Sequence, residues 1–234
     1  MRFTLQPLVL EIVVVGALLS VAAWPQSDSA GLERVLNQMD VAAKNFRSTE
    51  ASFVWEQYQR VIDETDTQKG RIYFRREGGE TQMAAEVAEP DQKYVLYSGG
   101  KIRVYQPKID QVNEYSPGKN RADIESFLVL GFGASGHDLL KSYDVKYQGS
   151  ETANGVEAAK LELVPKSARL RNNIARILLW IDPAKGVSVQ QQFFEPGGDY
   201  RLAKYSQIQI NQKLPDNVFK LKITGKTRFI SPQG

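Results

Sequence analysis

The sequence has no cysteine and only one histidine, His137, among its 234 residues. Without cysteine the chain has no thiolate nucleophile, no disulfide and no sulfur-ligated metal site. A single histidine excludes a metal site built on a pair of histidines and leaves one possible member for a histidine-dependent triad. These absences favour binding over chemistry, so we expect neither an enzyme nor a bound metal or cofactor.

An excess of charge of one sign is also absent. The 30 basic and 27 acidic residues give a net charge of only +3. This mixed balance predicts no nucleic-acid partner, because a nucleic-acid surface needs a dominant basic stripe. The chain has the length of one domain of about 200 residues, and a domain of that size buries a full core without disulfides or structural metal ions.

The first 23 residues differ from the rest of the chain. Arg2 is the only early cation, and an almost wholly apolar run over residues 8–21 is interrupted by Glu11 and ends near the small residue Ala23. This order is typical of a secretory signal peptide. The alternative is a membrane anchor, but the apolar run is shorter than the about 20 residues that span a bilayer.

We therefore divide the chain into three parts. Residues 1–23 are predicted to be a cleaved signal peptide, residues 24–31 a linker, and residues 32–234 one domain. The mature protein has no cysteine to carry a lipid anchor, and an exported, cysteine-free chain of bacterial type belongs in a periplasm.

The apolar periodicity predicts a mainly β fold. Between Leu32 and Phe46 apolar residues recur at helical spacing, which predicts one amphipathic helix. After Phe46 the period changes to two, and Gly and Pro turns separate short runs, which indicates about ten or eleven strands. We expect an incomplete antiparallel β-barrel that the N-terminal helix and short central helices cover. The predicted strands are residues 53–58, 71–76, 82–87, 93–97, 101–105, 111–115, 143–148, 158–164, 175–181, 188–194 and 201–210, and another extended piece is predicted near residues 226–230.

A glycine-rich segment at residues 131–136 matches the dinucleotide pattern G-x-G-x-x-G letter for letter. That pattern needs a preceding strand and a βαβ frame, but here the preceding apolar run has helical spacing. We predict a linker between two short helices. His137 and Asp138 follow it, and a surface or helix-capping role is expected for the histidine.

One face of several predicted strands is apolar and rich in aromatic residues. It has two interpretations: an ordinary core between sheet and helices, or a concave barrel face that binds an apolar ligand beneath a helical lid. The candidate lid residues are Ile124, Phe127, Leu128 and Leu130. The candidate ligand-binding residues are Phe53, Trp55, Ile72, Phe74, Val95, Tyr97, Ile102 and Val104.

A basic stretch lies between two predicted strands and contains Lys166, Arg169, Arg171 and Arg176. No aromatic residues interleave with these cations, so base stacking is not indicated. We expect a solvated hairpin that faces a partner, such as an acidic protein surface or lipid headgroups.

Several local patterns, taken in order, resemble the LolA family of periplasmic carriers and the related outer-membrane lipoprotein-sorting proteins. Residues 51–53 follow the first helix as the start of the first strand, and residues 70–76 form a strand that ends in a basic pair. Residues 98–107 resemble the family's glycine turn, strand and following tyrosine. Residues 179–182 match its second half. The resemblance covers nearly the whole mature chain.

The resemblance implies a function and a key residue. It implies an unclosed barrel that shields the acyl chains of lipid-modified proteins or lipids as cargo, with an inner-membrane donor complex and an outer-membrane acceptor as partners, and we expect a monomer. It also implies that Arg76, or its neighbour Arg75, hydrogen-bonds the lid when the barrel is empty. Glu77 departs from the family, which often has proline there. The alternative is a lipid- or protein-binding or sensing module with no transport role.

Overall fold

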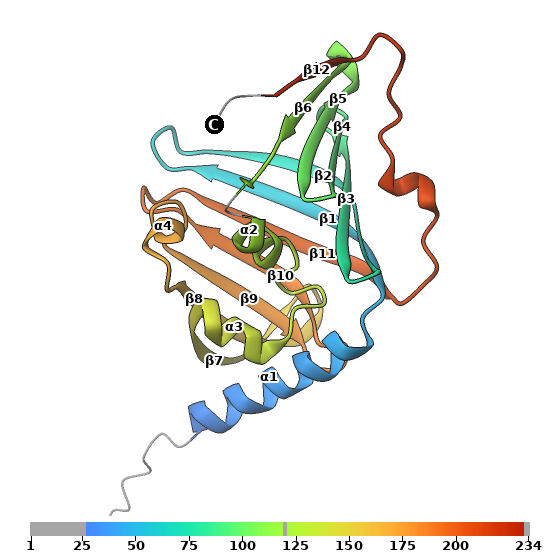
Figure 1. Ribbon diagram of the computed structural model, residues 1–234. Coiled ribbons are helices and arrows are strands. Elements are labelled where there is room, and N and C mark those ends of the chain that lie inside the picture. Colours follow the sequence, from blue (N-terminus) through green and yellow to red (C-terminus); the bar gives the residue numbers. More distant parts are fainter. Residues whose placement is uncertain (1–26, 119–120, 232–234) are drawn as a thin grey trace, which may run out of the picture.

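Twelve strands join into one curved sheet in the computed structural model, which describes residues 27–118 and 121–231 (Figure 1). The predicted signal peptide at residues 1–23 lies outside the described residues. The sheet order is β12-β6-β5-β4-β3-β2-β1-β11-β10-β9-β8-β7, so its two end strands, β12 and β7, are not joined. The prediction of a mainly β, unclosed barrel is confirmed.

Most strands run longer than the sequence pattern predicts. They are β1 (Ser48–Gln59), β2 (Glu64–Glu77), β3 (Glu80–Glu89), β4 (Lys93–Ser98), β5 (Lys101–Gln106), β6 (Gln111–Tyr115), β7 (Tyr143–Ala153), β8 (Val156–Pro165), β9 (Arg176–Asp182), β10 (Val187–Phe194), β11 (Tyr200–Ile210) and β12 (Arg228–Ile230). All neighbours pair antiparallel except β12, which runs parallel to β6. This strand raises the number to twelve, above the ten or eleven predicted.

The first helix, α1 (Ser27–Asn45), begins before Leu32, inside the segment 24–31 that the sequence predicts to be a linker. The helix continues through Gly31, which packs so closely on the ring of Tyr147 that a side chain there would collide. Its apolar stripe is buried, as the spacing predicts, with Met39 fully inaccessible. Among the described residues, no helix is both long and apolar enough to cross a membrane.

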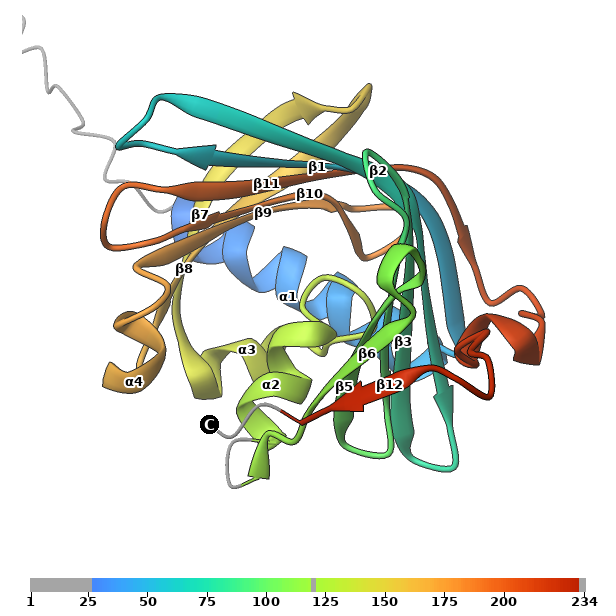
Figure 2. The same cartoon turned by 90° about the horizontal axis from the view of Figure 1, so that it is seen from above.

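The remaining helices are short. They are η1 (Pro107–Ile109), α2 (Arg121–Leu128), α3 (Gly136–Ser142), α4 (Ala168–Arg171) and η3 (Asp216–Phe219). Figure 2 shows α1, α2 and α3 on the concave side of the sheet, with α4 at one side of the opening. The concave face is therefore covered by helices, as the amphipathic strands require, because an open sheet cannot bury such a face against itself.

Two apolar clusters fill much of the concave side. The first lies over β1 to β4 and β11, and we call it the packed cluster; its central members are Phe46, Phe53, Ile72, Phe74, Tyr97, Phe132 and Tyr205. The second lies beneath α1 and α3 against β8 and β9, and we call it the helix cluster; its central members are Val35, Met39, Leu139, Leu161, Leu163, Ile177 and Leu179.

Candidate functional site

The predicted apolar face divides between solid core and open space. Four of its residues, Phe53, Ile72, Phe74 and Tyr97, are buried within the packed cluster. Val95 and Ile102 pack against that cluster and are only partly buried, and Val104 is also partly buried. Trp55 alone is exposed, at 40%. The ligand-binding role of the eight residues stays a prediction, and the structure places Trp55 nearest to open space.

A cavity of about 650 Å³ lies next to Trp55. The ends of β1, β2, β10 and β11 form its floor, and α2 and the α4 segment form its roof. This volume falls within the range of about 300–1,000 Å³ that is typical of small-molecule sites. Its apolar lining residues are Trp55, Ile124, Phe127, Leu170, Ile174, Phe193, Pro196 and Ala203. Charged residues also line the cavity, among them Glu56, Asp66, Glu195 and Arg201, so the lining suits a ligand with an apolar body and a polar end.

Helix α2 packs against both apolar clusters and borders the cavity. Ile124 and Leu128 pack against the packed cluster, while Phe127 packs against the helix cluster. The ring of Phe127 lies 5.1 Å from that of Phe193 on β10. Ile124 and Phe127 also line the cavity, so α2 has the place of a lid over it.

The fourth predicted lid residue, Leu130, does not belong to the helix. Helix α2 ends at Leu128, and Leu130 lies in the following turn with only 1% of its surface exposed. Its carbonyl accepts a hydrogen bond of 2.6 Å from the side chain of Gln191. The next carbonyl, that of Gly131, accepts a bond of 2.8 Å from the Ser188 N–H. These bonds fasten the turn after α2 to β10.

Arg76 ties the loop after α2 to the end of α1. Its guanidinium donates to the carbonyl of Gly133 at 2.7 Å and to the carbonyl of Ala43 at 3.0 Å. Ala43 lies in the last turn of α1, where carbonyls lack a partner within the helix and attract a cation. Gly133 has a positive φ, and a side chain there would collide with the ring of Phe46. The glycine thus brings its carbonyl within reach of Arg76.

Arg75 points to the opposite face of β2, as strand alternation requires. It pairs with Asp216 at 2.5 Å and lies over the ring of Phe219 at 4.4 Å. Both partners belong to η3, which packs on the convex side of the sheet with Tyr73 and Leu96. Of the two candidate arginines, Arg76 is the one that contacts the loop after α2.

A second polar contact holds α2, and the sequence reasoning did not include it. The Tyr97 hydroxyl donates to the carboxylate of Glu125 at 2.5 Å, and Arg121 donates to the same carboxylate at 2.8 Å. Burial and the bond to Glu125 raise the pKa of Tyr97 to about 12. The only signal in the sequence is Glu125 itself, an acidic residue between the apolar positions Ile124 and Phe127.

The basic stretch is exposed at all four predicted cations, Lys166, Arg169, Arg171 and Arg176, and its role in docking a partner stays a prediction. It contains α4, and its cations bond to the protein: Lys166 donates to the Leu140 carbonyl at 2.6 Å, and Arg171 donates to the Pro165 carbonyl at 3.0 Å. Arg176 lies 4.1 Å over the ring of Phe194. The stretch shapes one wall of the cavity, because these interactions fix the turn that carries the apolar lining residue Leu170.

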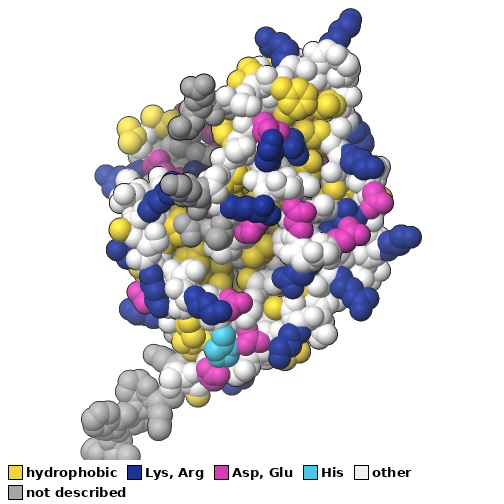
Figure 3. Space-filling model, viewed as in Figure 1, with side chains coloured by type: hydrophobic (Ala, Val, Ile, Leu, Met, Phe, Trp, Pro, Cys, Tyr) yellow, Lys and Arg dark blue, Asp and Glu magenta, His cyan; other side chains and the backbone are white. Residues whose placement is uncertain are grey.

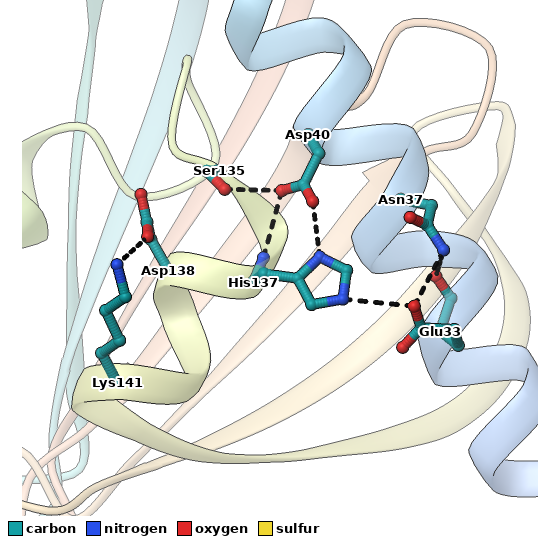
Figure 4. A network of polar contacts seen from close by, with 7 residues as sticks. All are labelled: Glu33, Asn37, Asp40, Ser135, His137, Asp138 and Lys141. Atoms are coloured by element: carbon teal, nitrogen blue, oxygen red, sulfur yellow. Dashed lines mark hydrogen bonds and ion pairs between the residues drawn. The ribbon is translucent and has the colours of Figure 1, made fainter.

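His137 joins α3 to α1 (Figure 4). Asp40 of α1 accepts hydrogen bonds from the Ser135 hydroxyl and the His137 N–H, and it contacts the His137 ring at 2.5 Å. Glu33 lies 3.2 Å from the other ring nitrogen. Figure 3 shows the histidine among acidic side chains on the surface. The bond to Asp40 raises the pKa of His137.

This network is structural in character. Burial raises the pKa of Asp40, but the hydrogen bonds from Ser135 and His137 outweigh it and lower that pKa overall. Asp138 pairs with Lys141 at 2.5 Å. Residues 131–135 link α2 to α3 as predicted, with no preceding strand. Within the described residues no cluster of metal-ligating side chains occurs.

The described residues form an open, curled sheet that wraps around helices and has a cavity beneath α2, which is an arrangement suited to binding. The family described as outer membrane lipoprotein carrier protein LolA matches residues 44–222. The chain belongs to this family. Among curated proteins, no match is found.

Solved structures share this fold at low identity. MucB is 15% identical with a TM-score of 0.53, and the match covers 82% of this chain and 63% of MucB, less than two thirds of its length. An uncharacterised protein from Thermus thermophilus is 12% identical (TM-score 0.52; 87% and 98% covered). The Mycobacterium tuberculosis lipoprotein LppX is 15% identical (TM-score 0.50; 81% and 99% covered). Such identities establish the fold alone.

Proposed function

We propose that the protein is a periplasmic carrier that shields acyl chains in the cavity beneath α2. Its cargo is a lipid-modified protein or a lipid, taken from an inner-membrane donor and passed to an outer-membrane acceptor. The observation that carries this proposal is the apolar cavity of about 650 Å³ with Trp55, Phe127 and Phe193 in its walls. Membership of the LolA family supports it.

The energetics of acyl chains favour such a carrier. Each methylene removed from water contributes about 0.8 kcal/mol, so a multi-acyl anchor does not cross an aqueous compartment unprotected. A cavity walled by aromatic and aliphatic side chains provides that protection without any covalent step. The absence of cysteine and the scarcity of histidine in the sequence agree with this mode of action.

A carrier must also release its load, and the polar contacts of the lid provide a way to do so. Arg76 bonds to the loop after α2, and Tyr97 bonds to Glu125 on α2 itself. A net hydrogen bond contributes about 1 kcal/mol, and more where one partner is charged. If these bonds form in the empty protein and break on loading, their loss offsets part of the favourable free energy of acyl binding. The acyl chain is then bound weakly enough to be released.

The direct test is binding of an acyl ligand. Native mass spectrometry of protein purified from periplasm is expected to reveal bound lipid or acylated protein. In solution, a fluorescent fatty acid is expected to bind and to be displaced by unlabelled acyl chains. Trp55→Glu places a charge in the cavity wall and is expected to weaken binding by about tenfold or more, because the ligand must then desolvate a carboxylate. Phe229→Glu, at a residue 56% exposed on β12, is the matched control and leaves binding unchanged.

Protein that is always empty and has no affinity for the fatty acid contradicts the proposal. Equal binding by Trp55→Glu and Phe229→Glu contradicts the location of the site. A salt-sensitive protein partner captured without any lipid would instead favour the binding or sensing module.

A further inference from the structure

The hairpin that joins β1 to β2 ends in two consecutive aliphatic residues, Val61 and Ile62. Val61 is 93% exposed and Ile62 is 54% exposed, and no other large apolar side chain in the described residues is as exposed as Val61. Tight turns usually carry glycine, proline or small polar residues, so two aliphatic residues at this position need a reason. Figure 3 shows apolar side chains at the upper left edge, where this hairpin ends in Figure 1.

The tip is held in a fixed position by the neighbouring β10–β11 hairpin. The Arg60 N–H donates to the Asp199 carboxylate at 2.9 Å. The rings of Tyr58 and Tyr200 stack with centroids 5.0 Å apart, and the Tyr58 hydroxyl donates to Asp63 at 2.9 Å. These contacts join the two hairpins next to the aliphatic pair, so the neighbouring hairpin supports the exposed tip.

The tip stands beside the mouth of the cavity. Gln57 and Asp66 of this hairpin, and Pro196 and Gly197 of the neighbouring one, line the cavity. Val61 lies four residues beyond Gln57, which at about 3.3 Å per residue places the tip at most roughly 13 Å past the lining. Figures 1 and 2 show both hairpin ends and α4 on the same side of the molecule.

We propose that Val61 and Ile62 insert into the surface of a phospholipid bilayer and turn the mouth of the cavity toward the lipid. This inference rests on the proposed function, since a cavity for acyl chains exchanges its load where its mouth meets lipid. The surface area of two side chains at a convex tip is far smaller than the roughly 800 Å² that each partner buries in a stable protein interface. The tip is therefore better suited to a bilayer than to a protein partner.

The surroundings of the tip fit the interface between lipid and water. Tyrosine is enriched at that interface, and the stacked Tyr58 and Tyr200 lie directly behind the aliphatic pair. The charges near the tip are mixed, with Arg60 beside Asp63 and Glu64. The bilayer contact is therefore apolar in origin and does not require anionic lipid.

The absence of native cysteine makes the test specific. Val61→Cys carries a single environment-sensitive fluorophore on the full chain, and Val41→Cys, at a residue 60% exposed on α1, is the matched control. With phosphatidylcholine vesicles, emission from position 61 is expected to shift to the blue and to rise, and a quencher carried on the acyl chains is expected to reduce it. Emission from position 41 stays unchanged. No response at position 61, or the same response at both positions, overturns the proposal.

A second variant separates this proposal from the carrier function. The double variant Val61→Ser with Ile62→Ser is expected to transfer a fluorescent fatty acid to vesicles about tenfold more slowly, because buried aliphatic carbons supply the contact. Its binding of the fatty acid without vesicles stays as in the original chain. Equal transfer rates overturn the membrane contact while the carrier function stands. If the original chain does not bind the fatty acid, the carrier function is refuted. The membrane contact is then tested by the fluorescence of the Val61→Cys variant alone.

Discussion

The two ends of the concave face are built from the same kind of strand, yet one end is solid and the other hollow. At the solid end, the ring of Phe132 stacks on Phe74 at 4.9 Å and meets Tyr205 edge-on at 4.8 Å. At the hollow end, Trp55 and Phe193 face a cavity of about 650 Å³. The difference arises from the side chains that the helices and their loops place on the concave side of the sheet.

The filler at the solid end comes from two loops. Phe46 follows α1, and Phe132 lies in the glycine-rich loop after α2; both are buried. At the hollow end, α2 and the α4 segment contribute lining residues such as Ile124, Phe127 and Leu170, and the ring of Phe127 packs against that of Phe193. The alternating pattern of the strands thus sets up a face that is ready for burial, and the covering segments decide where space remains.

The largest expected effect is on stability at the solid end. Phe132→Ala removes a ring that two other aromatic rings contact, and the loss of buried surface together with the new void is expected to cost about 3–5 kcal/mol. Denaturant unfolding followed by circular dichroism measures this change. Trp55→Ala at the hollow end is the matched comparison and is expected to cost less, since Trp55 is 40% exposed. Equal costs would show that the two ends do not differ in packing.

The next effect concerns Arg76, the proposed latch between the two ends. Arg76→Leu removes both bonds to the Gly133 and Ala43 carbonyls. The empty, closed state loses stability, so the loaded state gains population and release of an acyl ligand is expected to slow by about tenfold. Arg75→Leu is the control, since Arg75 contacts η3 and not the lid. Transfer to acceptor vesicles at the original rate by Arg76→Leu would reject the latch.

A smaller effect is expected at the other contact of the lid. Tyr97→Phe keeps the ring in the packed cluster and removes only the bond to Glu125, which retains Arg121 as a partner. One such bond corresponds to about 1–2 kcal/mol, so lid opening and the association of an acyl probe are expected to become a few-fold faster. Stopped-flow fluorescence measures the association rate. A slower or unchanged rate would mean that this bond does not restrain α2.

The smallest effect is a pH dependence far from the cavity. The contact with Asp40 raises the pKa of His137 in the folded state. The stabilisation is therefore complete below the unfolded value of about 6.5 and is lost as the pH rises through the higher folded pKa. Between about pH 6 and pH 8, the unfolding free energy of the original chain is expected to fall relative to that of His137→Ala. Parallel pH curves for the two proteins would contradict this contribution.

The features that depend on neighbours in the sequence were predictable. Alternation of apolar and polar residues predicts the strands because successive side chains of a strand point to opposite faces of the sheet. The helical spacing of Leu36 and Met39 predicts the buried stripe of α1. The glycine-rich loop was also predictable, because the dinucleotide pattern lacks its preceding strand. For Arg76, the resemblance to the family indicates a contact that geometry then places at Gly133.

The features that depend on distant residues were not predictable. The position of the cavity depends on which side chains fill the concave side, and Phe127 and Phe193 meet there only after folding. The bond between Tyr97 and Glu125 joins residues on separate elements. The basic stretch looks free in the sequence because its acceptors are backbone carbonyls, such as that of Leu140, which no sequence pattern marks.

Covalent mapping of a bound acyl chain tests the central claim most directly. A fatty acid with a photoreactive group near the end of its chain is bound to the protein, irradiated, and located by peptide mass spectrometry. The account predicts labelling of the hollow end, at Trp55, Phe127 or Phe193, and none at Phe132 in the solid end. Labelling of Phe132 and its neighbours, or of the convex face alone, would contradict it.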